Sequence, residues 1–126
     1  MKISATIILF AIYTHFWSFT QSYDSKKQWD LLNNGSENER IDAAKKLSVY
    51  YQSESIDSLR MVGETLFFFG IDNHYQPAIE FGKITLAEFY VMNGRINDGI
   101  VMAKATLPRL QERGDMALLT NVCKII

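Results

Sequence analysis

The chain has 126 residues and a mass of 14.5 kDa, which is the size of one domain. Apolar residues make up 48% and charged residues 21%, an ordinary globular balance that excludes an intrinsically disordered chain and a polytopic membrane protein. The formal net charge is −1. It becomes −2 without residues 1–20, in which Lys2 is the only charged residue. This weak charge favours neither nucleic acid nor an anionic membrane as partner, because phosphate binding needs clustered Lys and Arg.

Residues 1–20 have the three-part order of a secretory signal peptide. Lys2 precedes an apolar run over residues 7–12, and the small residues Ser18 and Thr20 suit a signal-peptidase site, which places cleavage before Gln21, with Ser22 as an alternative boundary. An uncleaved membrane anchor is the alternative, although His15 and several residues with hydroxyl groups disfavour a span of about 20 apolar residues. We therefore expect the rest of the chain to be exported from the cytoplasm.

From residue 23 onward, apolar residues recur at spacings of three and four, which predicts an all-α domain. Residues 21–35 are expected to form a short helix near residues 24–32, which buries Trp29 and Leu32, and a linker. The main domain then spans residues 36–126.

The first predicted hairpin starts at a capping box, in which the side chains of Ser36 and Glu39 each accept a hydrogen bond from a free backbone amide. Its second helix is capped by Ser55 or Asp57 and ends at Gly70 in a left-handed conformation. The apolar faces of the two helices consist of Ile41, Ala43, Ala44, Leu47, Tyr50 and Tyr51, and of Leu59, Val62, Leu66 and Phe69.

The third helix should start near "DNHYQP", with Pro77 in its first turn, and end at Gly94. A fourth helix is capped by Asn97 or Asp98, bends at Pro108 and ends at Gly114. Asp115 then caps a fifth helix, which is still apolar at the last residue. The predicted buried sides of the third and fourth helices are Ala78, Phe81, Gly82, Leu86, Phe89 and Tyr90, and Ile100, Ala103, Leu107 and Leu110.

The second hairpin repeats the residue order of the first. Leu47, Ser48 and Tyr51 recur as Leu86, Ala87 and Tyr90 after 39 residues, and Ile56, Leu59 and Gly63 recur as Ile96, Gly99 and Ala103 after 40 residues. One helical hairpin cannot bury both of its faces, so repeated hairpins stack and bury each other.

This order resembles the tetratricopeptide repeat, in which a leucine, a small residue and an aromatic residue mark the first helix, and small residues mark the second. The resemblance covers residues 36–126, with the last repeat incomplete, and implies a fragment of an α-solenoid. The repeats are longer than the usual roughly 34 residues, and Gly99 replaces the common alanine. The resemblance implies a structural role for Leu47, Tyr51, Leu86, Ala87, Tyr90, Gly94, Gly99 and Ala103.

The order of export signal, short helix and degenerate hairpins is also similar to the N-terminal sensing region of tetratricopeptide signalling proteins of Bacteroidetes-type bacteria. Those proteins continue into a membrane helix and a histidine kinase or a DNA-binding module. The resemblance implies a fragment that faces the periplasm, catalyses no reaction and binds a protein or peptide. The alternative is a structural module that self-associates through residues 115–126, with Leu118, Leu119, Val122 and Ile126 as its open face.

The sequence predicts no catalytic, cofactor or metal site. His74 is the only histidine after residue 20, and with Asp72 it offers too few ligands for a metal ion. Cys123 is expected to be a buried structural thiol. The basic pair Lys45 and Lys46 is expected to be a solvated face.

The stretch "LFFFG" places three phenylalanines at successive positions, Phe67 to Phe69, which span most of a helix circumference. At least one ring should therefore lie outside the hairpin core. Packing against a neighbouring helix is the favoured interpretation, and contact with a partner is the other. The polar candidates for partner binding are assigned to a groove between the first helices of the hairpins. The full set of candidate partner-binding residues is Tyr50, Phe68, Glu80, Lys83, Glu88 and Arg95.

Overall fold

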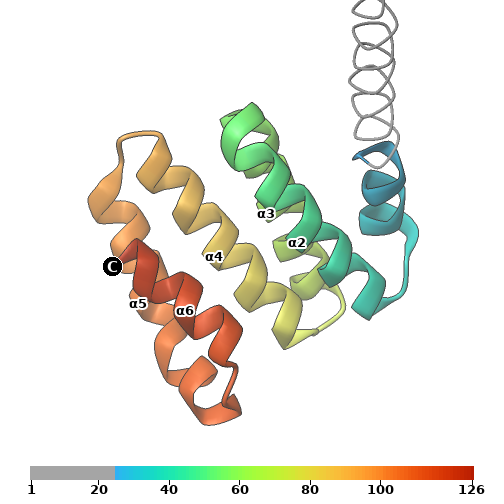
Figure 1. Ribbon diagram of the computed structural model, residues 1–126. Helices are drawn as coiled ribbons and strands as arrows, with labels where there is room; N and C mark the ends of the chain where they lie inside the picture. The colour runs from blue at the N-terminus through green and yellow to red at the C-terminus, as the bar shows by residue number, and fades with distance from the viewer. Residues whose placement is uncertain (1–24) are drawn as a thin grey trace, which may run out of the picture.

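The structure is a computed structural model that describes residues 25–126, so the predicted signal peptide lies outside the described residues. The described chain is entirely helical apart from short connections, which confirms the all-α prediction. Its helices pack in chain order as antiparallel pairs (Figure 1). They are α2 (Glu37–Glu54), α3 (Ile56–Asp72), α4 (Gln76–Met92), α5 (Ile96–Arg113) and α6 (Met116–Ile125), and before them the described chain is helical up to residue 34.

The helices form two layers. In Figure 1, α2, α4 and α6 lie side by side, with α3 and α5 behind them. The central helix α4 packs against α2, α3, α5 and α6. The helices of the front layer begin at Glu37, Gln76 and Met116, which are 39 and 40 residues apart, and the starts of α3 and α5 are 40 residues apart. These spacings equal the shifts found in the sequence.

Three helix caps follow the sequence. The hydroxyl of Ser36 accepts from the backbone N–H of Glu39, and the carboxylate of Glu39 accepts from the backbone N–H of Ser36 at 2.8 Å, which confirms the capping box. Ser55 rather than Asp57 caps α3, accepting from the amide of Ser58. Asp115 caps α6 as predicted.

The prediction that Gly70 ends α3 is wrong. The helix continues to Asp72, and the positive φ of this connection, 52°, belongs to His74. Gly70 is buried, and a Cβ atom there would lie 2.6 Å from the backbone nitrogen of Ile79 in α4. The glycine is therefore needed for the close approach of two helices, and not for a left-handed turn.

The predicted cap of α5 is also wrong. Arg95 is the N-cap residue, and neither Asn97 nor Asp98 caps the helix, because the turn at Gly94, with φ of 84°, already starts the helical hydrogen bonding at Arg95. At the other end, α5 runs through Pro108 to Arg113, so the bend predicted there stays a prediction. Gly114 ends the helix in a left-handed conformation, as predicted.

The core contains most of the predicted apolar positions and runs through all the helices. Four predicted core residues are more exposed than expected: Tyr50 is exposed, and Leu86, Tyr90 and Ile100 are half-buried. Among residues 25–126, no helix combines the length and the hydropathy needed to cross a membrane. The buried hydrophobic residues shared by the core are Leu32, Ala43, Ala44, Leu47, Val62, Leu66, Ala78, Phe81, Ile84, Ala87, Ala103, Leu110, Leu118 and Val122.

The helical segment of residues 25–34 is held on the domain by polar contacts as well as by Leu32. The indole N–H of Trp29 donates to the hydroxyl oxygen of Tyr51 at 2.8 Å. The guanidinium of Arg40 donates to the backbone carbonyl of Leu32 at 2.8 Å and lies 4.2 Å from the centre of the Phe69 ring. Arg40 therefore links the end of this segment to α2 and α3, which the sequence did not indicate.

Candidate binding groove

The central helix α4 has one tightly packed side. A Cβ atom at Gly82 would lie 2.7 Å from the backbone nitrogen of Phe67 in α3, and one at Gly99 of α5 would lie 2.7 Å from the carbonyl oxygen of Ala87. Small residues therefore let α3 and α5 approach the backbone of α4.

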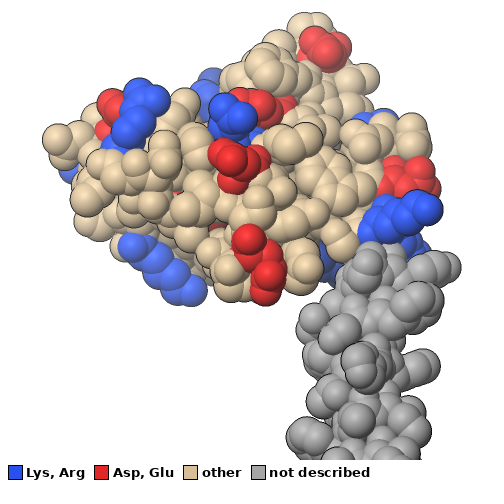
Figure 2. Space-filling view, turned by 90° about the horizontal axis from the view of Figure 1, so that it is seen from above, with Lys and Arg blue, Asp and Glu red and all other residues tan. Residues whose placement is uncertain are grey.

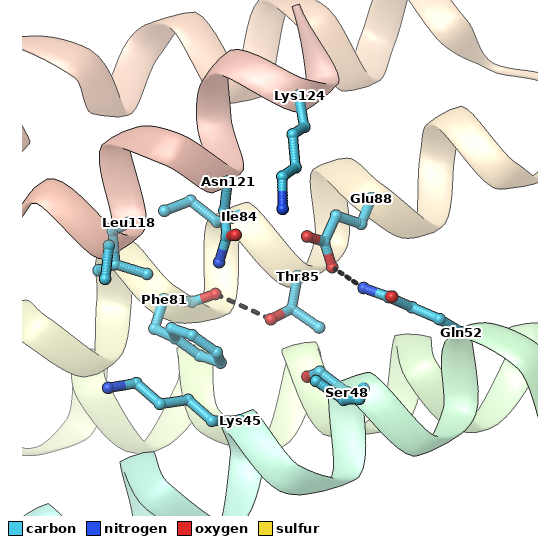
Figure 3. Close-up of a pocket in the computed structure, with 12 residues that line it drawn as sticks. Lys45, Ser48, Gln52, Phe81, Ile84, Thr85, Glu88, Leu118, Asn121 and Lys124 are labelled. Carbon is cyan, nitrogen blue, oxygen red and sulfur yellow. Dashed lines mark hydrogen bonds between the residues drawn. The ribbon is translucent and has the colours of Figure 1, made fainter.

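On its other side α4 leaves space between α2 and α6. A cavity of about 390 Å³ lies there, and Figure 3 shows its lining side chains. Each helix contributes residues spaced about three or four apart, the spacing of one helix face. The lining residues are Lys45, Ser48, Val49 and Gln52 of α2; Phe81, Ile84, Thr85 and Glu88 of α4; and Ala117, Leu118, Asn121 and Lys124 of α6.

A second hollow of about 220 Å³ continues this cavity toward the start of α2. The two share Lys45, Phe81 and Leu118, and the second extends to Asn38 and Arg113. We call the combined feature the α2/α4/α6 groove. Its lining residues on α2 run from Asn38 to Gln52, and at 1.5 Å per residue this is about 21 Å, or the length of about six residues of extended chain.

The floor of the groove is apolar. Phe81, Ile84 and Leu118 are all buried, and Thr85 uses its hydroxyl to donate to the carbonyl oxygen of Phe81 at 3.0 Å. Val49 lies at the rim with 72% of its surface exposed. An apolar floor with an exposed apolar rim favours contact with another chain's side chains.

One end of the groove carries a carboxylate in a partly desolvated position. The amide nitrogen of Gln52 donates to Oε2 of Glu88 at 3.1 Å, and the Nζ of Lys124 points toward the same carboxylate (Figure 3). Burial raises the pKa of Glu88, and the hydrogen bond from Gln52 and the charge of Lys124 oppose this only in part. The protonated form of Glu88 is therefore favoured more than for a carboxyl group in water.

The middle of the groove carries an unused cation and an unused hydroxyl. Among residues 25–126, Lys45 forms no ion pair, whereas Arg113 is paired with Glu80 and with Asp115. Ser48 is 5% exposed, and its Oγ has no hydrogen-bond partner within the described chain. A buried hydroxyl without a partner is uncommon, since leaving it unpaired costs free energy.

Of the candidate partner-binding residues on α4, the structure places Glu88 in the groove and Glu80 and Lys83 outside the main cavity. Glu80 is buried, with 3% of its side chain exposed, and pairs with Arg113 of α5. Lys83 follows Phe81 by two residues and so lies about 200° around α4 from it. Glu80 therefore links two helices, and Lys83 faces away from the groove.

The three remaining candidates lie apart from one another. The ring of Tyr50 packs edge-on against Tyr51, with centroids 5.1 Å apart. Arg95 lies in the connection before α5, over the ring of Tyr90, and pairs with Asp98. Phe68 is 59% exposed on α3, in the rear layer, which confirms that one ring of "LFFFG" lies outside the hairpin core. The six candidates therefore do not form one surface.

Sequence reasoning did not assign a binding role to several lining residues, and it treated Lys45 only as part of a solvated face. A signal for them was present on α2, where Ile41, Lys45, Ser48 and Gln52 follow at spacings of four, three and four. This places polar residues in line with an apolar one on a single helix face. In the main cavity, the other unassigned residues with polar side chains are Thr85 of α4 and Asn121 and Lys124 of α6.

The predicted burial of Cys123 is wrong, because the thiol is exposed. The terminal helix α6 instead turns Leu118 and Val122, four residues apart, into the core. Two of the four residues predicted for an open apolar face are thus covered by the domain itself, and Cys123 lies one position, or about 100°, further round. Among residues 25–126, no group of three His, Cys, Asp or Glu side chains is arranged to hold a metal ion.

The charged surface has no large area of one sign on the face seen in Figure 2, where basic and acidic side chains lie in small groups separated by other residues. The structure thus defines an all-α domain of antiparallel helix pairs with an extended groove and, on the face seen in Figure 2, side chains of mixed charge. Comparison with protein-family models, with curated proteins and with solved structures gives no match to the chain.

Proposed function

We propose that this chain is a non-enzymatic interaction domain of tetratricopeptide-like hairpins that binds a peptide segment of another protein. The observation that carries the proposal is the α2/α4/α6 groove, which the first helices of successive helix pairs line together. Its apolar floor, exposed rim and length of about six extended residues suit a peptide better than a compact metabolite.

The regular spacing of the helix starts supports the tetratricopeptide-like part of the proposal. Repeats of 39 and 40 residues, with small residues at the contacts between helices, are what stacked hairpins require. The sequence resemblance extends the proposal to a biological setting. In it, the chain is exported, faces the periplasm and serves as the sensing or scaffolding part of a bacterial signalling protein.

Selection from a random heptapeptide library on the full chain tests the proposal. The affinities of the selected peptides are then measured by fluorescence anisotropy for Val49→Asp and Val101→Asp. These two valines are 72% and 69% exposed, and only Val49 lines the groove. We expect Val49→Asp to weaken binding about tenfold or more, because it places a charge on an apolar contact, and Val101→Asp to have no effect.

Failure to select any peptide, or equal losses in the two variants, would contradict a peptide-binding role for the groove. Circular dichroism of both variants controls for folding. The similar exposure of the two side chains matches the variants for the effect of adding a charge at the surface.

Self-association through residues 115–126 is the second candidate function. It is favoured by the terminal helix α6, where Met116 is 71% and Ile126 48% exposed. Sedimentation velocity over a range of concentrations tests it, and Met116→Asp should shift a dimer toward monomer. A monomer at all concentrations would exclude this candidate while leaving the groove proposal intact.

A further inference from the structure

We propose that the occupant of the α2/α4/α6 groove is an extended peptide segment with an acidic side chain near its middle, and that Lys45 and Ser48 bind its carboxylate. This inference rests on the peptide-binding function proposed above and specifies the chemistry of the partner. Its basis is the distribution of charge along the groove.

Lys45 occupies the centre of the groove, where the two hollows meet. Phe81 and Leu118, which line both hollows with it, are buried apolar residues. Lys45 is itself exposed, so its ammonium group attracts a carboxylate through a charge that solvent partly screens, and the apolar floor beside it strengthens the attraction on the groove side. The absence of an ion pair to Lys45 among residues 25–126 leaves its charge available for a ligand.

Ser48 lies one turn further along the same face of α2 and also lines the groove. Its hydroxyl is buried and has no partner within residues 25–126. A carboxylate bound at Lys45 would provide the acceptor that this hydroxyl lacks once a rotation about χ1 of Ser48 turns the buried Oγ toward the groove, and hydrogen bonds to charged groups are stronger than those between neutral ones. The free chain thus carries an unsatisfied donor beside an unpaired cation.

The charges at the two ends of the groove are already matched. Arg113 pairs with Asp115 at one end, and at the other end the carboxyl group of Glu88 already faces the charge of Lys124, although the two form no ion pair. The preference for negative charge is therefore concentrated in the middle and is not spread over the whole surface. In Figure 3 the amide of Asn121 points into the groove, and the amides of Asn121 and Gln52 offer both donors and acceptors to the backbone of an extended segment.

Four pools of N-acetylated, C-amidated heptapeptides test the inference, with the central residue fixed as Glu, Gln, Lys or Ala and the other positions varied. Binding of each pool to the full chain is measured by affinity capture with mass-spectrometric counting. We expect the Glu pool to be retained about tenfold better than the Gln pool, the size of effect that a charge-assisted contact gives. Blocked termini ensure that only a side-chain carboxylate is tested.

Two charge reversals one residue apart provide the matched control. Lys45→Glu should abolish the preference for Glu and shift it to the Lys pool, whereas Lys46→Glu, exposed and outside the lining, should leave it unchanged. Ser48→Ala should lower the Glu-to-Gln ratio about threefold without changing binding of the Ala pool.

Binding of all four pools at equal levels, or equal effects of the two lysine reversals, would overturn the inference and leave the proposed peptide-binding function standing. Retention of no pool at all would overturn both. A preference for Glu that survives Lys45→Glu would show that the carboxylate binds elsewhere, and would also overturn the inference.

Discussion

The two sides of α4 differ in how closely their neighbours approach. Toward α3, Gly82 lies so near the Phe67 backbone that even one added methyl group would overlap it. Toward α2 and α6, the same helix presents Phe81, Thr85 and Glu88 to a cavity of about 390 Å³. One helix therefore provides close packing on one side and an open groove on the other.

This difference indicates that the side of α4 facing α3 and α5 stabilises the fold, whereas the side facing α2 and α6 is available for binding. Close backbone contact gains dispersion energy and leaves no room for a ligand, as expected of a side that holds the fold together. The groove side retains an unpaired hydroxyl at Ser48 and a partly desolvated carboxyl group at Glu88, both of which lower the stability of the free chain. Groups that a fold does not need for its own stability are available for a partner.

The largest expected effect comes from adding a methyl group on the packed side. In Gly82→Ala, the new Cβ would lie 2.7 Å from the backbone nitrogen of Phe67, so two helix backbones must separate. We expect a loss of about 2 kcal/mol in the free energy of unfolding, because overpacking outweighs the better helix propensity of alanine. Urea denaturation followed by circular dichroism measures it, and an unchanged or higher stability would contradict the close contact between α3 and α4.

The opposite sign is expected for alanine on the groove side. Ser48→Ala removes a buried hydroxyl without a partner and introduces the best helix former, so we expect the free energy of unfolding to rise by about 0.5 kcal/mol or more. The same urea experiment checks this. A clear loss of stability would mean that the hydroxyl has a partner in the free chain, and the comparison between the two sides of α4 would lose one of its supports.

The smallest effect concerns the pH dependence contributed by Glu88. Burial raises the pKa of its carboxyl group in the folded chain, so on raising the pH the unfolded chain loses this proton first. Stability contributed by the neutral form is present below the unfolded pKa of about 4.5 and is lost as the pH rises through the higher folded value. The stability of the parent relative to Glu88→Gln should therefore fall with rising pH in mildly acidic solution.

Glu64→Gln serves as the control for this measurement, since Glu64 is on α3 and its partner Arg60 is well exposed. The difference in unfolding free energy between the parent and each glutamine variant is compared from about pH 4 to pH 7, the range in which carboxyl groups of raised pKa titrate. If the stability of the parent relative to Glu88→Gln rises with pH instead, the groove favours the charged form of Glu88. That result would contradict the effect of burial on this carboxyl group.

Much of the fold could be predicted from the sequence because the signals were local. The capping box at Ser36, the proline in the first turn of α4 and the glycine after α5 each act within a few residues of the helix end they define. Gly70 was misassigned because its reason lies in another helix, at Ile79. The residues next to a glycine in the sequence do not indicate whether another helix packs closely against it.

The groove could be predicted only in outline. The assignment of a binding face to the first helices of the hairpins identified Glu88, but Glu80 is paired with Arg113, a residue that follows it by 33 positions. Which side of a helix faces a groove depends on how three helices are rotated against each other. That rotation is set by packing, so Lys45, Ser48 and Asn121 became candidates only in the structure.

Chemical-shift mapping tests the central claim most directly, namely that the open side of α4 is the binding surface. The ¹⁵N-labelled chain is titrated with the tightest peptide from the heptapeptide selection, and its backbone amide signals are followed. The account predicts that the shifted amides belong to α2, α4 and α6 along the groove, with Ser48, Thr85 and Asn121 among them. Shifts centred instead on Phe68 of α3 or on Met116 and Ile126 would contradict it.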